Sequence, residues 1–507
     1  MSIFFLDKPA YAETHYKFKL PWSLLYRPWP EFFFDTPFQF QVGSEKKIWV
    51  IIKDAHRFPV LLKQVKISLK NHETEINFEK TLDIFSDSPL AFYPIELGEL
   101  PPGDYTVFPE ITVQKKDKTK TFKRWNFPFL SPKPLQFKVL KEELPIPEGY
   151  FAGEMHCHTR YSSDQIEFGA SPQVLQEAAS AVGLDFVCCT DHAYDFAFSE
   201  SDYLKEDNPV SRFNSLKKEI HALKKTPLML AGEEVSAGNS EGENVHMTVF
   251  APENYISGLG DCGRYWLKNE PTISISKVLE STESPCFAAH PKAPMGFLEK
   301  FIFRRGYWNS KDLKFSKKQI RGIQFWNGSR DEGFFEGKKF WLEELGKGNF
   351  LLPIGGNDAH GDLNDCVSVK IPLFSLRYER NHVFGKVRTV VKAKDLTEEE
   401  LKAAFQTHSV YITDGPALWW EKEGDSFKLY AHSNEELGIF KSIKIFARTI
   451  DFQGKLSKSE IQKTLQPGKM ESFQFWGQTL RKNEPYVFMV YPAGKPEKIR
   501  SEAGVSL

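Results

Sequence analysis

The chain has 507 residues, more than one ordinary domain holds, so two to four domains are expected. Its formal net charge of -1 argues against a dedicated nucleic-acid-binding protein, which usually carries an excess of basic residues. Hydrophobic residues make up 41% and charged residues 26%, which is typical of a soluble globular protein. No apolar run reaches the roughly 18 residues that a membrane-spanning helix needs, so no membrane association is expected.

Cysteine usage and the N-terminal sequence both bear on the compartment. The N-terminus lacks the basic segment and long apolar run of a signal peptide. The cysteines show no disulfide-framework spacing and no CxxC pair; they are Cys157, Cys188, Cys189, Cys262, Cys286 and Cys366. We therefore expect reduced thiols in a cytoplasmic protein.

Residues 1–146 alternate apolar and polar side chains and are enriched in β-branched and aromatic residues. Segments such as "KIWVIIKD", "VLLKQVKISLK" and "DYTVFPEITVQ" are typical of strands, and "ELPPGDY" is typical of a turn. Strands at hairpin spacing without long helical patterns predict an immunoglobulin-like β-sandwich. The proline-bearing stretch 141–150 is expected to be a linker.

Strand-like and helix-like segments alternate from residue 149 onward. In "SPQVLQEAASAVG" we expect Ser171 to be the N-cap, Pro172 the first helical residue and Gly183 the stop. Seven strands alternating with helices predict a parallel sheet or a barrel.

The pattern changes again towards the C-terminus. "TEEELKAAFQTH" predicts a helix with a capping-box start at Thr397 and Glu400. Segments such as "FKLYAHS", "SIKIFART" and "PYVFMVYPAG" predict strands, so residues 417–507 are expected to form a small β-rich domain.

Polar residues that suit a metal cluster stand at one end of the central strands. The stretch "GEMHCHTRYSSD" (153–164) carries His156, His158 and Asp164 within nine positions. The other candidates along the chain are His192, Glu234, His246, His290, Asp358 and His360. The carboxyl ends of the strands of a βα barrel face the same way, so these residues would converge. Imidazole with carboxylate is typical of zinc, manganese or iron sites.

The motifs "HCHTRYSSD", "TDH", "GEEV", "AHP" and "NDAH", in this order over roughly residues 149–415, resemble those of the PHP (polymerase and histidinol phosphatase) family. The segment "RTVVKAKDLTEEELKAAFQTHSVYITDGPAL" further resembles the carbaryl-hydrolase (CehA/McbA-type) branch. The resemblance implies an α/β fold in which a distorted seven-stranded (β/α)7 barrel at 149–416 is flanked by the β-sandwich (1–146) and the C-terminal β-domain (417–507).

The resemblance also implies two or three divalent metal ions (Zn, Mn or Fe). The implied ligands are His156, His158 and Asp358 for the first ion, Glu234 as a bridge, His246 and His290 for the second ion, and Asp164, His192 and His360 for a third. Family members often have histidine at the position of Asp164; aspartate is the weaker ligand there, so the cluster is expected to be dinuclear or trinuclear.

Neighbouring residues at these strand ends need separate interpretation. Adjacent strand residues face opposite sides, so only one of Glu233 and Glu234 can point to the cluster, and the family pattern selects Glu234. The same argument turns Asp191 away from the metals and makes it a hydrogen-bond partner. Arg160, just past the first histidine pair, is a candidate for substrate contact. Asn327, in "FWNGS", is a candidate either to donate to substrate or to orient a ligand, with a role in the turn as the alternative.

We expect a metal-dependent hydrolase in which a metal-bridged hydroxide attacks a small phosphate ester, because two metal ions lower the pKa of a shared water. Two alternatives remain: a carboxylester, carbamate or amide hydrolase, and a non-catalytic, metal-stabilised binding protein. An arginine cluster at the metals would favour phosphate, and an aromatic-lined pocket with few cations would favour a carboxyl-type ester. The expected partner is a small-molecule ester, with no nucleic acid and no membrane; the oligomeric state is not specified by the sequence.

Overall fold

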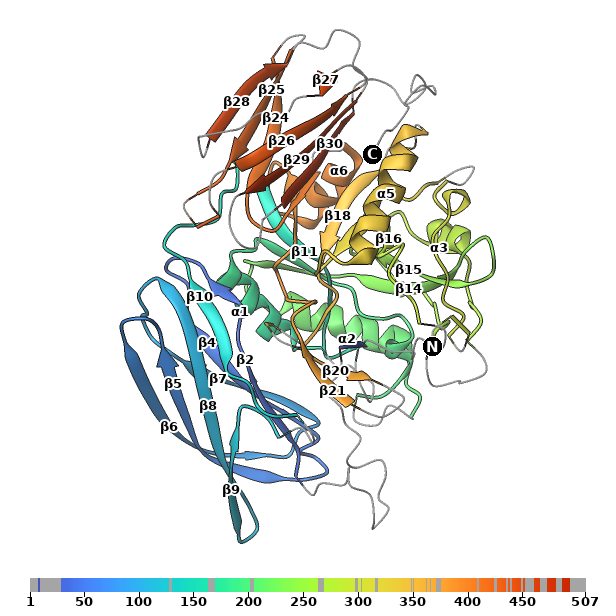
Figure 1. The fold of residues 1–507 in the computed structure, drawn as a ribbon. Helices are drawn as coiled ribbons and strands as arrows, with labels where there is room; N and C mark the ends of the chain where they lie inside the picture. The colour runs from blue at the N-terminus through green and yellow to red at the C-terminus, as the bar shows by residue number, and fades with distance from the viewer. Residues whose placement is uncertain are drawn as a thin grey trace, which may run out of the picture.

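The computed structural model describes most of the chain as a predominantly β molecule (Figure 1). The described residues are 8–9, 29–126, 130–162, 169–200, 205–262, 269–296, 300–301, 303–314, 318–347, 349, 351–361, 363–364, 366–370, 375–407, 410–423, 426–434, 436–437, 440–447, 450–451, 460–465, 472–479 and 486–492. Within these residues six sheets and five α-helices are present.

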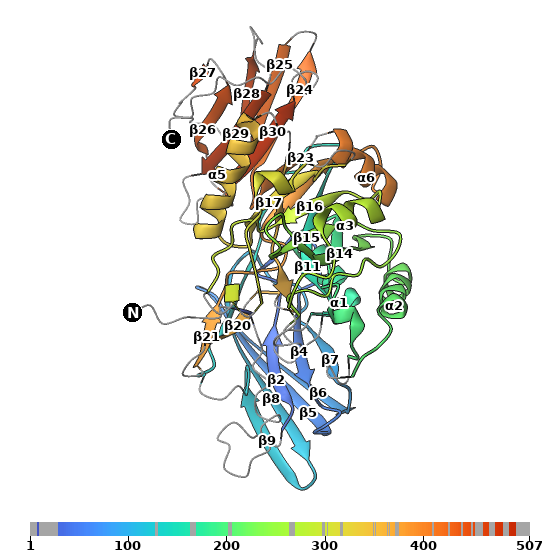
Figure 2. The ribbon, with the colours of Figure 1, turned by 90° about the vertical axis from the view of Figure 1, so that its right-hand side faces the viewer.

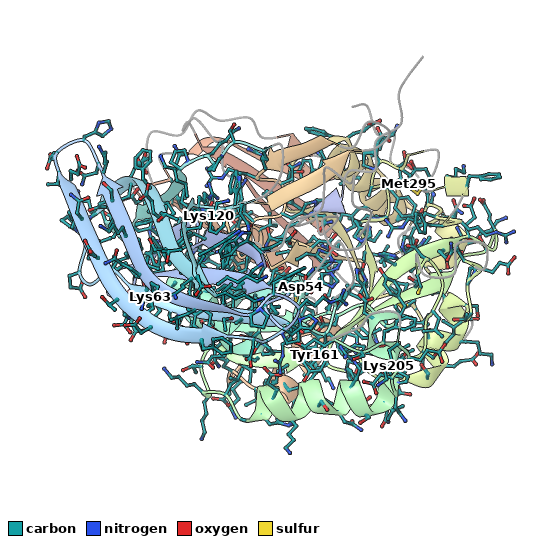
Figure 3. All side chains as sticks on the ribbon, turned by 90° about the horizontal axis from the view of Figure 1, so that it is seen from below. Asp54, Lys63, Lys120, Tyr161, Lys205 and Met295 are labelled. Atoms are coloured by element: carbon teal, nitrogen blue, oxygen red, sulfur yellow. The ribbon has the colours of Figure 1, made fainter. Side chains whose placement is uncertain are left out.

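Two sheets form the N-terminal part of the molecule, drawn in blue and cyan in Figure 1. The larger sheet has the order β3 (Gln39–Phe40), β10 (Leu135–Val139), β8 (Gly103–Lys115), β5 (Val60–Lys70) and β6 (Glu75–Ser86), with β9 (Lys118–Lys123) on β8. The smaller sheet has the order β2 (Glu31–Asp35), β4 (Lys47–Lys53) and β7 (Leu90–Glu96). One apolar core joins them, because Phe34 and Val50 of the smaller sheet pack with Ile67 and Val107 of the larger. Seen from below, these strands lie to one side of the central helices (Figure 3).

The central strands fall into two further sheets. The longer sheet has the order β13 (Leu228–Ala231), β12 (Phe186–Cys189), β11 (Tyr150–His158), β22 (Arg388–Lys392), β23 (Val410–Thr413), β30 (Tyr486–Pro492), β29 (Ser472–Thr479), β26 (Phe440–Ala447) and β27 (Ile450–Asp451), with β19 (Ala359–His360) on β11. The other has the order β14 (Glu233–Gly238), β15 (Asn244–Val249), β16 (Cys286–Ala289), β17 (Gly322–Asn327) and β18 (Leu352–Gly356).

This arrangement corrects the predicted (β/α)7 barrel, which is wrong. β14 and β15 form an antiparallel hairpin, and β15 also runs antiparallel to β16. β11 pairs antiparallel with β22, and the sheet continues from there into β23 and β30. The described central strands therefore form two open sheets with antiparallel pairs, and not one closed ring of parallel strands.

Only some of the strands beyond residue 417 form a sheet of their own. β30, β29, β26 and β27 lie beyond residue 417 but extend the same sheet as β11. A separate sheet is formed by β24 (Ala417–Glu423), β25 (Ser426–His432) and β28 (Glu460–Leu465), and another by β1 (Lys8–Pro9), β20 (Cys366–Lys370) and β21 (Ser375–Glu379). The division of the chain at 146–149 and 416–417 stays a prediction.

The helices cover the central sheets. They are α1 (Pro172–Val182), α2 (Pro209–His221), α3 (Ile275–Ser281), α5 (Glu332–Gly346) and α6 (Glu398–Thr407), with 3-10 turns η1 (Asp195–Ala197) and η2 (Ser310–Asp312). α1 contacts β12, α2 contacts β13, α5 contacts β17 and α6 contacts β22. Figure 2 shows α2, α3 and α6 along one side and α5 on the other. No helix in the described part of the chain is both long and apolar enough to span a bilayer.

Candidate metal centre

The candidate ligands come from the ends of strands in both central sheets. His156 and His158 are alternate residues of β11, so they face the same side, and both are fully buried. His192 follows β12, and a backbone bridge joins it to Glu234 of β14. His246 lies in β15, His290 follows β16, and Asp358 and His360 follow β18. The structure thus brings together every predicted ligand except Asp164, which lies outside the described residues.

Glu234 is the centre of this group. Its Oε2 lies 3.3 Å from His156 Nε2, 3.5 Å from His158 Nε2 and 2.9 Å from His192 Nδ1. Its Oε1 lies 2.7 Å from His246 Nδ1 and 3.1 Å from His290 Nε2. One buried carboxylate therefore faces five imidazoles, with its two oxygens turned to different sets of rings.

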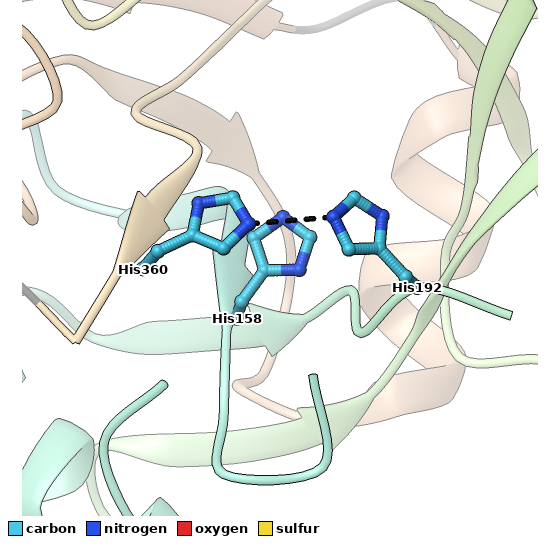
Figure 4. A group of neighbouring side chains, drawn as sticks. All are labelled: His158, His192 and His360. Atoms are coloured by element: carbon cyan, nitrogen blue, oxygen red, sulfur yellow. Dashed lines mark hydrogen bonds between the residues drawn. The ribbon is translucent and has the colours of Figure 1, made fainter. Parts of the chain in front are cut away.

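A second carboxylate closes one end of the group. Asp358 Oδ1 lies 3.4 Å from His156 Nε2 and 3.0 Å from His158 Nε2. His360 stacks on His158 with ring centroids 3.9 Å apart, and its Nε2 lies 3.3 Å from His192 Nε2. Figure 4 shows His158, His192 and His360 turned towards one another, with the His192–His360 contact dashed.

The spacing of these atoms fits a divalent ion. Three sets of candidate ligand atoms each lie within 4.8 Å of one another: His158, His192 and His360; His156, His158, Glu234 and Asp358; and His192, Glu234 and His246. A four-coordinate ion with ligands at about 2.0–2.1 Å separates its ligand atoms by about 3.3 Å. His156 Nε2 and Glu234 Oε2, buried and 3.3 Å apart, have no hydrogen-bond partner among the described residues. Buried polar atoms of this kind need a partner, and an ion would satisfy both.

The surrounding charges keep the two carboxylates of the cluster in the ionised form that binds metal ions. Burial tends to raise the pKa of Glu234, but the charges of His246, His156 and His192 hold this pKa well below its usual range. Burial also tends to raise the pKa of Asp358, but the nearby charge of His156 outweighs burial and holds this pKa well below its usual range. Both carboxylates are therefore ionised, as metal ligands must be.

The imidazoles divide into two classes. Burial lowers the pKa of His360 to about 4, and burial with the neighbouring His360 and His192 lowers that of His158 far below its usual value. Burial also lowers the pKa of His192 and of His290. Burial alone would lower the pKa of His156 as well, but Glu234 and Asp358 raise it to about 10. The proton that the carboxylates hold on His156 is the charge that a bound cation would replace.

The backbone at two candidate ligands is strained. His290 has φ 27° and Asp358 has φ 53°, both in the left-handed region that non-glycine residues seldom adopt. Such conformations cost about 1–3 kcal/mol each and gather at functional sites. Here each one turns a side chain from a strand end into the cluster.

Gln324, which helps to hold the candidate ligands, was not predicted from the sequence, whereas Asn327 was. Gln324 Oε1 lies 2.7 Å from His156 Nδ1, and Gln324 Nε2 donates to Asn327 Oδ1 at 2.9 Å. Asn327 Nδ2 in turn donates to Asp358 Oδ2 at 3.0 Å. A continuous chain of side chains therefore orients His156 and Asp358 together. An isolated glutamine inside the buried strand "GIQFWN" was the only sequence signal for Gln324.

Glu154 and Asp191 fix the backbone around the cluster. Glu154, fully buried in β11, accepts hydrogen bonds from the backbone N–H groups of His156, Asn357 and Gly385 and from the Asn357 side chain. Asp191 accepts from Thr159 N at 2.8 Å and Thr159 Oγ1 at 2.7 Å, as expected for a residue that faces away from the ligands. Glu233 also faces away and accepts from Ile256 N.

The two candidates for substrate contacts have different positions. Arg160 donates to Glu219 at 3.0 Å, lies 3.8 Å from Glu200, and does not line the cavity at the cluster. The prediction that Arg160 contacts substrate is therefore not supported by its position. Asn327 lies on the cavity wall and bonds Asp358.

A cavity of about 450 Å³ opens over the cluster. Its wall includes the candidate ligands His192, Glu234, His246, His290, Asp358 and His360. The same wall includes apolar and aromatic side chains, those of Met295, Tyr307, Trp308, Phe325 and Phe334. Among the described residues of the wall, Arg305 is the one arginine or lysine, and its Nε donates to Asp261.

Comparisons with known proteins add little to this picture. No protein-family model matches the chain, and no curated protein matches it. Among solved structures, two of a Parabacteroides merdae beta-glucuronidase align at 9% and 10% identity with TM-scores of 0.18 and 0.19, covering 92% of this chain and 77% of theirs. A Paenibacillus sp. cycloisomaltooligosaccharide glucanotransferase aligns at 9% identity with a TM-score of 0.15, covering 91% of this chain and 70% of its own. Likeness at these TM-scores carries no argument about fold or activity.

Proposed function

We propose that the protein is a metal-dependent hydrolase of small-molecule esters. The observation that carries the proposal is the convergence of six histidines on Glu234 and Asp358, with both carboxylates ionised and two buried ligand atoms lacking hydrogen bonds. The sequence resemblance to the PHP family and its carbaryl-hydrolase branch, which rests on the motifs, supports the same chemistry.

Two divalent ions would occupy the cluster, and zinc, manganese and iron all suit its candidate ligands. We assign His156, His158 and Asp358 to one ion, His246 and His290 to the other, and Glu234 to both, because its two oxygens face the two sets of rings. A third ion would use His192, His360 and Asp164. Bound divalent ions acidify water and polarise a carbonyl or phosphoryl oxygen.

The side chains of the cavity set what the ions can act on. The cavity wall also carries the apolar and aromatic residues Met295, Tyr307, Trp308 and Phe334, which favours a substrate with an apolar or aromatic group. Asn327 holds Asp358 and keeps its carboxylate turned to the cluster.

The scarcity of cations on the cavity wall favours an uncharged substrate. A phosphate monoester carries up to two negative charges and is usually met by several arginines or lysines. The described wall holds Arg305 alone, and Asp261 neutralises it. We therefore favour a carboxylester, carbamate or amide, and keep the small phosphate ester as the alternative that the same assay tests. A cytoplasmic location, with free buried thiols, belongs to the proposal.

The test is a metal count combined with parallel assays. The protein would be purified without added metal, reconstituted with zinc, manganese or iron, and assayed on p-nitrophenyl acetate, a p-nitrophenyl carbamate, p-nitrophenyl phosphate and bis-p-nitrophenyl phosphate. His156→Ala and Asp358→Ala are the test variants, and His221→Ala, an exposed histidine of α2, is the matched control.

We expect two or three ions per chain, and turnover that His156→Ala and Asp358→Ala abolish while His221→Ala retains it. Faster turnover of the acyl substrates supports the favoured class, and faster turnover of the phosphate substrates supports the alternative. Fewer than one ion per chain after reconstitution, with no activity that the variants remove, would refute the hydrolase and leave a binding protein.

A further inference from the structure

His246 lies between two carboxylates. Its Nδ1 is 2.7 Å from Glu234 Oε1, and its Nε2 is 3.0 Å from Asp261 Oδ2. Asp261 is 3% exposed and belongs to none of the three candidate ligand sets, because it lies on the far side of the ring from the cluster. None of the ligand motifs in the sequence contains Asp261.

The two nitrogens of a metal-binding histidine have separate tasks. One nitrogen binds the ion, and the other donates its N–H to a carboxylate or carbonyl, which fixes the tautomer and the ring orientation. Nδ1 of His246 faces Glu234 and the rest of the cluster, so Nε2 is the nitrogen that carries the hydrogen. Asp261 is the acceptor that stands at this position.

The fold holds Asp261 in place through its backbone. Asp261 has φ 64°, and the preceding Gly260 approaches β15 so closely that a Cβ on it would lie 2.0 Å from Asn244 Oδ1. The same loop is bridged to β14 between Leu259 and Ser236. This close passage along the hairpin places the Asp261 carboxylate at His246.

Arg305 supports Asp261 from the cavity side. Its Nε donates to Asp261 Oδ2, the same oxygen that faces His246. Two backbone hydrogen bonds dock its segment on β15: Asn244 N donates to Arg304 O at 2.7 Å, and Gly306 N donates to Asn244 O at 2.9 Å. The guanidinium therefore balances the negative charge of Asp261.

We propose that Asp261 is a positioning residue for the second metal site, that it fixes His246 with Nδ1 towards the ion, and that Arg305 holds Asp261 for this task. This inference rests on the proposed function, because it needs ions at the cluster. It adds a residue and a role that the ligand motifs do not contain.

The experiment measures the affinity of the whole protein for Zn²⁺ and Co²⁺ by competition with a chelator, together with the number of ions bound at saturation. Asp261→Ala and Asp261→Asn are the test variants. Asp312→Asn is the matched control, since Asp312 is also a buried aspartate but accepts from the backbone N–H groups of Ser240 and Asn309. Circular dichroism and the folded fraction are recorded for each variant, and Asp261→Asn, which keeps its volume, serves if Asp261→Ala does not fold.

We expect Asp261→Ala to weaken the binding of one ion by about 10- to 100-fold and leave the other within about twofold, with the number of ions at saturation unchanged. Asp261→Asn retains one oxygen acceptor and is expected to lose less. The visible spectrum of bound Co²⁺ should change in both Asp261 variants and not in Asp312→Asn.

Three results would overturn the inference: affinity in both Asp261 variants equal to wild type, an equal loss in Asp312→Asn, or the loss of a whole ion at saturation, which would make Asp261 a ligand. If the wild-type protein itself binds less than one ion, the proposed function fails. If it binds ions and hydrolyses esters while Asp261→Ala binds them as tightly, only this inference fails.

Discussion

At the scale of single residues, the cluster balances charge with protons. Glu234 and Asp358 are both ionised, and they raise the pKa of His156 to about 10. Glu234 and the Asp261 hydrogen bond also raise the pKa of His246, against the effect of burial. The metal-free cluster at neutral pH therefore holds at least one proton that a ligand imidazole must lose before it binds an ion.

Metal binding is consequently expected to release protons and to strengthen as the pH rises. Between pH 6 and 8 the affinity should increase by about tenfold per pH unit for each proton released, because His156 stays protonated up to about pH 10 in the metal-free protein. Isothermal titration calorimetry in buffers of different ionisation enthalpy counts these protons. An affinity that does not change over this pH range would contradict the assigned protonation of His156.

The chain of hydrogen bonds from His156 through Gln324 and Asn327 to Asp358 gives a second prediction at this scale. Gln324→Met keeps the volume but removes both the partner of His156 Nδ1 and the donor to Asn327. We expect metal affinity to fall by about 10- to 100-fold. Gln176→Met, at a buried glutamine of α1 that bonds Lys224 O and Pro227 O, is the control and should leave the affinity unchanged. Equal affinities in the two variants would show that the chain does not orient the ligands.

The candidate ligands were accessible to sequence reasoning because each one stands in a short motif at a strand end. The hydrogen-bond partners of the ligands could not be predicted in this way, because Gln324 and Asp261 lie outside the motifs and reach His156 and His246 from other segments of the chain. The substrate contact of Arg160 stays a prediction: its place beside two candidate ligands fixes its backbone, while its side chain donates to Glu219 on α2.

At the scale of secondary structure, local signals were read correctly where local chemistry decides the conformation. Ser171 caps α1 by accepting from Val174 N, Pro172 begins the helix, and Gly183 ends it with φ 77°. The antiparallel hairpin of β14 and β15 was not predicted from the sequence. Only residues 239–243 separate β14 from β15, too few for the crossover of a dozen or more residues that parallel strands need. That connection length, read from the sequence, already excludes a parallel arrangement there.

Glu154 links three segments and gives a prediction at this scale. Its oxygens accept only from N–H donors of His156, Asn357 and Gly385, which belong to β11, the turn after β18 and the loop before β22. In Glu154→Gln, an amide N–H₂ replaces one of these oxygens and faces backbone N–H donors, which are then left without an acceptor. We therefore expect the free energy of unfolding to fall by about 2–4 kcal/mol. Urea denaturation of the metal-free protein measures it.

The matched control is Glu177→Gln on α1, where the carboxylate pairs with Lys47 and is partly exposed. Its free energy of unfolding should change by less than about 1 kcal/mol. If Glu154→Gln were as stable as this control, the buried carboxylate would not be what joins the three segments.

At the scale of the whole molecule, the cluster lies where the two central sheets meet. His156, His158 and His360 belong to strands of the longer sheet, and Glu234 and His246 to strands of the other. In the described part of the chain no named strand of one sheet pairs with a strand of the other, apart from the isolated backbone bridge between His192 and Glu234. The side chains of the cluster therefore join the two sheets, together with hydrogen bonds such as those from Asp358 N to His156 O and from Thr389 Oγ1 to Gly355 O.

Because the ligands come from both sheets, ions that bind the folded protein are expected to stabilise the two sheets against separation. At a free ion concentration of about 100 times the dissociation constant, one ion adds about 2.7 kcal/mol, which corresponds to a rise in Tm of roughly 2–3 °C for a protein of this size. Differential scanning calorimetry with and without a chelator measures the shift, and hydrogen exchange should show protection of β11 and β14 together when ions are bound. His158→Ala, which removes a ligand from one sheet only, should bring the Tm of the metal-loaded protein close to that of the metal-free wild type. A metal-induced shift that survives in this variant, or protection confined to one sheet, would mean that the ions bind elsewhere and do not join the sheets.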